Sequence, residues 1–327
     1  MKTFYRRATL LSVLLALLLP LLSVTVAAHT SRIDRYLVVG MDDAASNTDV
    51  MAVISYSHAD RAVTVLQIPR DTYYFFGGEQ NKLNQLYPHL LGGRDTRAAK
   101  ELAMKGLASA VSSLLGVSVS TYIAVSLSDF SLMIDRIGGV PMRLPIEITY
   151  RDEESGETVV LPRGVHTLSG KAASAFVRYR AGYATGDLGR IDAQKLFISS
   201  LFAKLASGIT PRTMTSVFGS VRRSLITNLT LPEAISCGIC FMRRYKGTQI
   251  HYLTLPGAAA FANGISYYSV CRTSASEAVE KWLLFEKGKA DIDVGGKGLA
   301  RDIPPLAEIY HRKAVHYRVY TDAELKE

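Results

Sequence analysis

The chain is poor in cysteine and tryptophan, with three cysteines and one tryptophan among its 327 residues. An odd number of cysteines cannot pair completely within one chain, which excludes a full disulfide framework. Cys237 and Cys240 form a Cys-x-x-Cys inside the apolar run 235–242, a setting that favours buried thiols on a core helix. A disulfide or redox pair is the alternative at these two positions, and Cys271 is left over.

Several catalytic motifs are absent as well. The sequence contains no Gly-x-Ser-x-Gly elbow and no His-Glu-x-x-His, and its seven histidines show no metal-ligand spacing. Residues 164–171 resemble a P-loop, but five residues separate the two glycines and Ala172 stands where Ser or Thr is required. The sequence therefore does not match the templates of α/β serine hydrolases, zinc proteases or P-loop NTPases.

The chain also lacks internal repeats, low-complexity tracts and a Pro- or Ser-rich linker, which favours one large domain. Acidic residues are fewer than basic ones, and the formal net charge is +9. This excess favours an anionic partner such as acidic glycan, lipid phosphate or nucleic acid. We expect no nucleic acid, because the sequence has neither an RNA-binding signature nor a zinc pattern and its amino terminus predicts export.

That amino terminus is a basic segment followed by an apolar one. Lys2, Arg6 and Arg7 precede an apolar run over 8–28, which at ~1.5 Å per residue is long enough to cross a bilayer core of about 30 Å. Basic residues before such a run hold the amino terminus in the cytoplasm. We therefore predict a cytoplasmic tail over 1–7, one transmembrane helix over 8–28, and a single-pass protein of the cell membrane with an extracellular domain. A cleaved signal peptide ending near Ala28 is the alternative.

Hydrophobic patterning predicts an α/β fold in which helices cover both faces of a central mixed sheet. Strands are expected over 35–40, 50–56, 62–68, 121–125 and 249–255, and a hairpin over 146–161. Helices are expected over 95–115, 128–137, 231–244 and 274–286, with two more on either side of a loop near Gly182. The extracellular domain is expected to span 35–286, and the polar tail 287–327 to be only partly ordered.

The stretch 169–194 brings three arginines together around a glycine-containing loop. Arg178 and Arg180 are two apart, so on extended backbone they share one face. Arg190 and Gln194 are four apart on a helical stripe that continues with apolar residues, so this stripe points inward. Arginine forks donate two parallel hydrogen bonds to phosphate oxygens. The stretch therefore predicts an anion site, with a solvated basic helix face as the alternative.

Two aspartates and a further arginine fall at strand ends. Asp42 and Asp49 flank the loop between the first two strands, which places both carboxylates near one sheet edge. Paired carboxylates suit Mg²⁺, whose remaining positions go to water and substrate phosphate. Aspartates that only form a turn are the alternative. Arg70 follows the third strand, at a position where open α/β sheets commonly bind ligands.

Taken together, these residues resemble the LytR-CpsA-Psr proteins of bacterial cell envelopes. The resemblance covers about residues 35–206 and is weaker beyond them. The matching blocks are Leu37-Val-Val-Gly-Met-Asp42, Thr48-Asp49-Val-Met, Ile68-Pro-Arg-Asp71, Lys82-Leu-Asn84, Ile137-Gly-Gly-Val140, Gly164-Val-His-Thr-Leu-Ser-Gly170, Val177-Arg-Tyr-Arg180 and Asp187-Leu-Gly-Arg190 with Gln194.

The resemblance implies transfer of a glycopolymer, such as a teichoic acid or capsule, from polyprenyl pyrophosphate to a peptidoglycan sugar hydroxyl, with release of polyprenyl phosphate. Membrane lipid and peptidoglycan would then be partners, and Mg²⁺ or Mn²⁺ would be held by Asp42 and Asp49. The residues implied in pyrophosphate binding are Arg70, Lys82, Arg178, Arg180, Arg190 and Gln194. Those implied in catalysis are Arg70, Asp187 and Arg190. Hydrolysis of the same pyrophosphate and binding of polyprenyl phosphate without turnover remain open.

The chain departs from the family pattern at two positions. The family often has an arginine near Asn47 and another directly before the glutamine, where this chain has Ala193. Fewer cations imply weaker pyrophosphate binding or a different polymer. Asp187 or Asp71 can serve as general base, and Asp71 can instead pair with Arg70 and position it. The sequence does not identify the glycopolymer or the oligomeric state.

Overall fold

The computed structural model describes residues 32–42, 48–151, 156–184, 186–208, 210–222, 224–292 and 303–326. The predicted cytoplasmic tail and transmembrane helix, 1–7 and 8–28, lie outside these residues. Within the described ranges, no helix is both long and apolar enough to span a bilayer.

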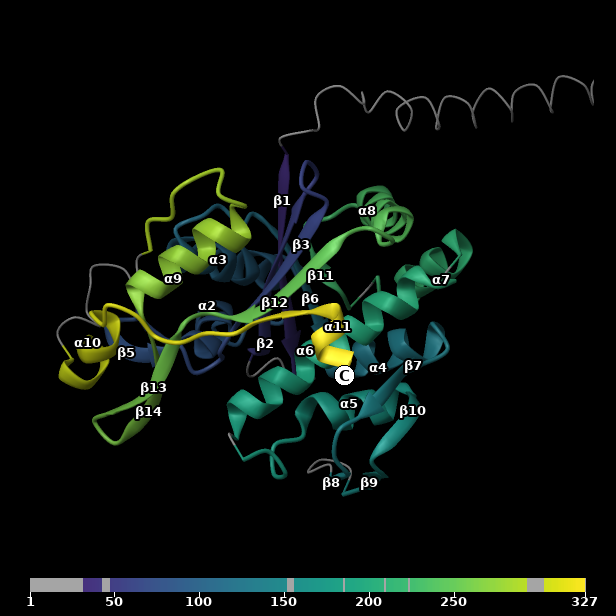
Figure 1. Ribbon diagram of the computed structural model, residues 1–327, viewed down its shortest axis with the longest axis horizontal. Coiled ribbons are helices and arrows are strands. Elements are labelled where there is room, and N and C mark those ends of the chain that lie inside the picture. The colour runs from purple at the N-terminus through teal and green to yellow at the C-terminus, as the bar shows by residue number, and fades with distance from the viewer. Residues whose placement is uncertain are drawn as a thin grey trace, which may run out of the picture.

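A seven-stranded mixed sheet forms the centre of the molecule, in the order β11-β6-β1-β2-β3-β12-β15 (Figure 1). Its strands are β1 (Ile33–Met41), β2 (Thr48–Ser57), β3 (Ala62–Ile68), β6 (Thr121–Ser126), β11 (Ile226–Thr227), β12 (Gln249–Thr254) and β15 (Val319–Thr321). β1, β2 and β3 pair antiparallel in turn, whereas β6 is parallel to β1 and β12 is parallel to β3. The predicted mixed sheet is confirmed.

The longer helices begin and end at positions that the sequence marks. They are α3 (Arg97–Leu115), α4 (Leu127–Arg136), α5 (Gly170–Arg178), α6 (Asp187–Ala206), α7 (Pro211–Val221) and α8 (Leu231–Arg244). The shorter ones are η1 (Leu83–Gln85), α2 (Leu86–Leu91), α9 (Arg272–Ala278), the π-helical turn η2 (Val279–Leu283), α10 (Pro304–Tyr310) and α11 (Asp322–Lys326). For example, Thr96 Oγ1 accepts a hydrogen bond from the Ala99 N–H at the start of α3. Gly116 ends α3 with a left-handed φ of 64°, a conformation that favours glycine.

Successive residues of the strands enter different cores, because strand side chains alternate between the two faces of a sheet. Val53 and Leu66 pack in the core that α3 covers. Ala52 and Val65, next to them in sequence, pack in the core that α6 covers. Helices therefore cover both faces of the sheet, as the α/β prediction requires.

Four two-stranded ribbons flank the sheet. They are β4 (Tyr73–Phe76) with β5 (Glu79–Lys82), β7 (Val140–Leu144) with β10 (Gly164–Leu168), β8 (Ile148–Arg151) with β9 (Thr158–Leu161), and β13 (Gly257–Ala262) with β14 (Ile265–Val270). The hairpin predicted over 146–161 is confirmed as β8 and β9. The β13–β14 hairpin was not predicted, although its turn, Asn263-Gly264, has the left-handed φ values of 52° and 77° that two-residue hairpins favour.

The carboxyl-terminal residues contribute to the fold. β15 pairs with β12 at the edge of the sheet, and α11 packs against α6. Asp322, the first residue of α11, accepts hydrogen bonds from Ser199 Oγ (2.7 Å), Tyr245 OH (2.8 Å) and Tyr252 OH (2.8 Å). One carboxylate thus joins α6, β12 and the residue after α8. We call β15 and α11 the carboxyl-terminal strap.

Because Tyr252 bonds to Asp322 in the strap, we expect the free energy of unfolding to decrease at alkaline pH. Burial, reinforced by the nearby Asp322 charge, raises the pKa of Tyr252 well above its ordinary value. The folded chain therefore holds this proton above about pH 10, where an unfolded tyrosine loses it. The stability that Tyr252 contributes is therefore fully present below about pH 10. The free energy of unfolding should decrease as the pH rises above that value.

Urea unfolding between pH 8 and 11 measures this fall. Tyr252→Phe should be less stable at pH 8, because it loses a hydrogen bond to a carboxylate worth about 1.5–3 kcal/mol. It should also show a shallower fall above pH 10 than the wild type. Equal slopes in the two proteins would contradict the assignment.

Candidate functional site

The strand directions bring the predicted charged residues to one edge of the sheet. β1 and β3 are both antiparallel to β2, so their carboxyl ends lie at the edge where β2 begins. Asp42 directly follows β1, Asp49 is the second residue of β2, and Arg70 follows β3 by two residues. The structure therefore places these three residues at the edge that the sequence predicted, and we call it the site edge.

Asp49 occupies an irregularity in the sheet. The register of β1 with β2 runs from Gly40 opposite Val50 to Met41 opposite Thr48, so Asp49 is an extra residue without a partner position. A bulge of this kind turns a side chain away from its regular direction and is common beside functional sites. Asp49 Oδ1 accepts a hydrogen bond of 2.8 Å from Arg70 Nη1.

This ion pair orients Arg70 and adds little stability. The side chains of Arg70 and Asp49 are 22% and 38% exposed, and pairs this accessible to water contribute at most about 1 kcal/mol. Backbone bonds also hold the turn: the Thr72 N–H donates to Pro69 O at 3.0 Å, and the Asn84 N–H donates to Arg70 O at 3.2 Å.

Asp71 and Lys82 form a second pair beside the first. Lys82 Nζ lies 3.1 Å from Asp71 Oδ1 and 6.0 Å from the ring centre of Tyr267. Asp71 therefore pairs with Lys82 in the structure, and not with Arg70 as the sequence allowed. The reason is that the β4–β5 hairpin, whose last residue is Lys82, folds back onto the turn after β3.

The arginines of the α5–α6 connection lie on different local structures. Arg178 is the last residue of α5, and its guanidinium lies 5.2 Å from the ring centre of Tyr150. The prediction that Arg178 and Arg180 share an extended backbone is wrong for Arg178. Ser169 caps α5, and the helix continues through Arg178 before Tyr179 becomes extended.

Two turns carry the chain from Arg180 to α6. The Tyr183 N–H donates to Arg180 O at 3.1 Å, and the Gly186 N–H donates to Tyr183 O at 2.9 Å. Gly186, with a left-handed φ of 58°, precedes Asp187 at the first position of α6. The structure describes the backbone of Asp187 but not its side chain, so its predicted catalytic role lies outside the described contacts.

The predicted inward face of α6 is confirmed. Arg190, Gln194 and Phe197 are 4%, 5% and 3% exposed, although the first two are polar. Gln194 Oε1 accepts a hydrogen bond from Gln67 Nε2 at 3.1 Å, and Gln194 Nε2 donates to Val177 O at 2.9 Å. Gln67 was not among the predicted site residues. The feature that could have identified it is a glutamine within the predicted strand 62–68, all of whose residues are buried in the structure.

The donor chemistry of the site edge fits a hard divalent cation. Asp42 and Asp49 supply carboxylate oxygens, which Mg²⁺ prefers. No group of three or more His, Cys, Asp or Glu side chains among the described residues forms a metal cage. A metal here would take its other ligands from substrate and water.

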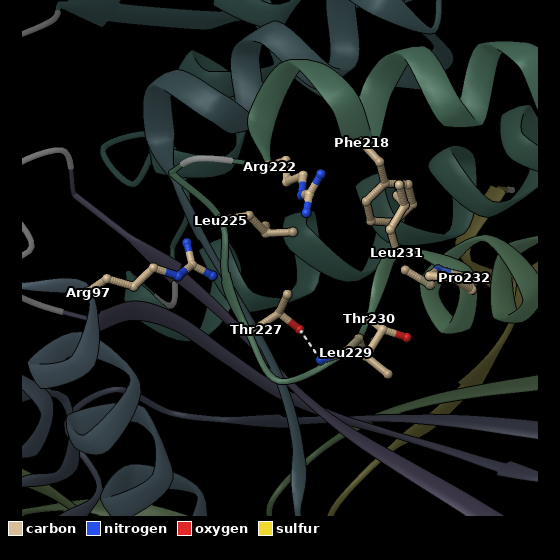
Figure 2. A pocket seen from close by; sticks show the side chains of 10 residues that line it. Arg97, Phe218, Arg222, Leu225, Thr227, Leu229, Thr230, Leu231 and Pro232 are labelled. Carbon is tan, nitrogen blue, oxygen red and sulfur yellow. Dashed lines mark hydrogen bonds between the residues drawn. The ribbon is translucent and has the colours of Figure 1, made fainter.

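Two surface cavities lie away from the site edge. One, of 840 Å³, opens between β11, α7 and α8 (Figure 2). Its apolar wall includes Phe218, Leu225 and Leu231, and the guanidinium groups of Arg97 and Arg222 also line it. The other, of 350 Å³, lies where α4, α6 and α7 meet. Neither is lined by a predicted site residue.

Solved structures share this arrangement of sheet and helices. TagV of Bacillus subtilis matches with a TM-score of 0.62 and 20% identity, over 77% of this chain and 98% of its own. A Streptococcus agalactiae protein matches with a TM-score of 0.66 and 18% identity, over 81% and 91%. A structure of TagT bound to LIIa-WTA has a TM-score of 0.56 and 21% identity, over 76% and 88%. These proteins share the fold.

The chain belongs to the LytR_cpsA_psr family, whose model matches residues 29–282. The cell wall biosynthesis protein LcpA of Corynebacterium glutamicum is 31% identical over 57% of this chain and 38% of its own length. Two Bacillus subtilis proteins, TagV and TagU, are named polyisoprenyl-teichoic acid–peptidoglycan teichoic acid transferases. They are 23% and 25% identical over 76% and 75% of this chain, and over 63% and 75% of their own lengths. The chain thus spans less than two thirds of LcpA and of TagV.

The sequence predicts that Arg70, Arg178, Arg180 and Arg190 bind one anion, so we expect pyrophosphate to stabilise the folded chain. A ligand that binds only the folded chain adds about 2.7 kcal/mol of stability at a hundred times its Kd. Arg190→Lys should lose much of this gain, because an ammonium group cannot replace a bidentate guanidinium. Thermal unfolding with and without inorganic pyrophosphate measures the difference.

Arg312→Lys is the matched control, because Arg312 pairs with Glu308 on the exposed face of α10. It should keep the full ligand-induced shift. If pyrophosphate shifts the unfolding temperature of wild type and Arg190→Lys equally, Arg190 is not part of the anion site.

Proposed function

We propose that this chain transfers a secondary cell-wall glycopolymer from a polyprenyl-pyrophosphate carrier to a sugar hydroxyl of peptidoglycan. The observation that carries the proposal is the pairing of Arg70 with Asp49 at the site edge, together with the hydrogen bond from Gln67 on β3 to Gln194, which lies one helical turn after the buried Arg190 on α6. Family membership and the names of TagV and TagU as teichoic acid transferases support the same reaction class.

The reaction would exchange one phosphorus–oxygen bond for another. The sugar hydroxyl oxygen attacks the phosphorus nearest the glycan, and the bond from that phosphorus to the bridging oxygen breaks. Polyprenyl phosphate leaves with the bonding electrons, and the hydroxyl proton passes to a base. This reaction needs no covalent intermediate with the protein. The protein would therefore contribute mainly by positioning the reactants and neutralising their charge.

The arginines would supply that neutralisation. Arg70, Arg178, Arg180 and Arg190 would donate to the pyrophosphate oxygens, with Lys82 beside them. Gln194 has a second amide hydrogen beyond the one it gives to Val177 O, so it would donate as well. Preorganised donors of this kind are each worth about 10²–10³ in rate.

Asp42 and Asp49 would hold Mg²⁺ or Mn²⁺, which when bound supplies positive charge to the phosphate oxygens. Asp49 would then serve two cations, since its Oδ1 already accepts from Arg70. A carboxylate has a second oxygen for this purpose.

The base would be Asp187 or Asp71. Asp187 is the first residue of α6. Asp71 is held by Lys82.

The carrier lipid and the predicted anchor over 8–28 would keep the domain at the outer face of the cell membrane.

A reconstituted assay tests the proposal. The full chain in detergent is mixed with lipid-linked glycopolymer, Mg²⁺ and peptidoglycan fragments, and joined and free polymer are separated. Asp49→Asn and Arg70→Lys should each lower the rate of transfer by about 10²–10³. Asp60→Asn, which alters an exposed carboxylate paired with Lys287, should transfer at the wild-type rate.

Free polymer as the main product would make the chain a hydrolase. Binding without either product would make it a lipid-binding protein. Wild-type rates in both site variants would remove the site edge from the chemistry.

A further inference from the structure

Gln67 is a polar side chain buried in an apolar core. It is 2% exposed and lies on the same face of β3 as Val63 and Val65, which pack in the core under α6. Its Oε1 atom is buried and has no hydrogen-bond partner among the described residues. A buried acceptor left this way destabilises the fold, because it has lost its hydrogen bonds to water without gaining others. Stability alone therefore does not explain a glutamine at this position.

Gln67 begins a chain of hydrogen bonds that crosses three elements. Its Nε2 donates to Gln194 Oε1 on α6 at 3.1 Å, and Gln194 Nε2 donates to the carbonyl of Val177 near the end of α5 at 2.9 Å. Both side chains are buried, so water competes weakly for these bonds. We call this chain the glutamine relay.

Each link of the relay stands beside an arginine of the candidate site. Arg70, two residues after the end of β3, follows Gln67 by three residues. On α6, Arg190 precedes Gln194 by one helical turn. On α5, Arg178 is the residue after Val177. The relay therefore connects the backbones that carry three of the predicted phosphate ligands.

Those backbones need a connection, because the arginines repel one another. Two guanidinium groups drawn together around one anion repel one another, most strongly where water is excluded. A site that is already assembled does not spend ligand affinity on bringing its groups together. A buried polar contact is direction-specific, whereas apolar packing tolerates sliding.

We propose that Gln67 is a positioning residue that, through Gln194, sets the spacing of Arg70, Arg178 and Arg190 and so determines the affinity of the site for pyrophosphate. This inference rests on the proposed function for its ligand. It deepens that function by assigning a role to a residue that does not touch the substrate.

The test compares two substitutions at Gln67 with one beside it. Gln67→Met keeps the length of the side chain and removes the amide. Gln67→Asn keeps the amide but is one methylene shorter, so it cannot make the bond to Gln194. Val65→Ala is the control, because Val65 is fully buried on the same strand face and lies outside the relay. The control should lower the free energy of unfolding through lost packing alone.

Two measurements on the full chain in detergent decide the outcome. Calorimetry with inorganic pyrophosphate should show binding about tenfold weaker in both Gln67 variants, within the range that outer partners of a site are worth. It should be unchanged in Val65→Ala. Hydrogen exchange should be faster in both Gln67 variants at the amides of Tyr183 and Gly186, whose turns connect α5 with α6, and not in the control.

If both Gln67 variants match Val65→Ala in affinity and exchange, the relay has no positioning role and the inference is overturned. If the wild type itself does not bind pyrophosphate, the proposed function fails instead. The exchange comparison then still decides whether Gln67 holds α5 and α6 in place.

Discussion

Repulsion between like charges is the constraint that the site edge has to satisfy. In the proposed function several arginines would share one anion, and each would need its own means of staying close to it. Arg70 is held by the carboxylate of Asp49, Arg178 lies against the ring of Tyr150, and Arg190 is buried on α6. A carboxylate, an aromatic face and a helix core are three different solutions, and they come from three different elements.

The helix that carries Arg190 is in turn held from two sides. Near the site edge, Gln194 bonds to β3 and α5. One residue further, the side chain of Lys195 is 3% exposed, with Nζ 2.8 Å from Asp192 Oδ1 and 4.9 Å from the ring centre of Tyr320. Burial lowers the pKa of Lys195, although Asp192 opposes this effect. The carboxyl-terminal strap therefore covers the outer side of α6 with polar contacts that suit a helix fixed in position.

Local patterns in the sequence predicted the parts of the fold that local forces determine. The strand over 62–68, the helix over 95–115 and the inward stripe from Arg190 to Phe197 all follow from the spacing of neighbouring residues. The edge position of Asp42, Asp49 and Arg70 followed from strand order.

Long-range contacts could not be predicted in the same way. The partner of Gln67 is 127 positions away, and the carboxylate that binds Ser199 comes from Asp322 near the end of the chain. The pairing of Asp71 with Lys82 depends on how a hairpin folds back. Arg178 was misplaced for a local reason, since the helix capped by Ser169 continues further than the Val-Arg-Tyr-Arg pattern suggested. All of the predicted roles remain predictions: pyrophosphate binding by Arg70, Lys82, Arg178, Arg180, Arg190 and Gln194, catalysis by Arg70, Asp187 and Arg190, and metal binding by Asp42 and Asp49.

The contact between Asp49 and Arg70 links the two halves of the proposed site. Without ligand, the carboxylate neutralises the arginine, and neither is fully available to another partner. Two aspartates alone leave Mg²⁺ short of ligands, and one oxygen of Asp49 already accepts from Arg70. A pyrophosphate would give Arg70 a second anionic partner and the cation its missing ligands. Its oxygens could bind Arg70 and also complete the coordination of a cation on Asp42 and Asp49. The bulge at Asp49 places one carboxylate where the two roles meet, so metal and pyrophosphate would each bind better in the presence of the other.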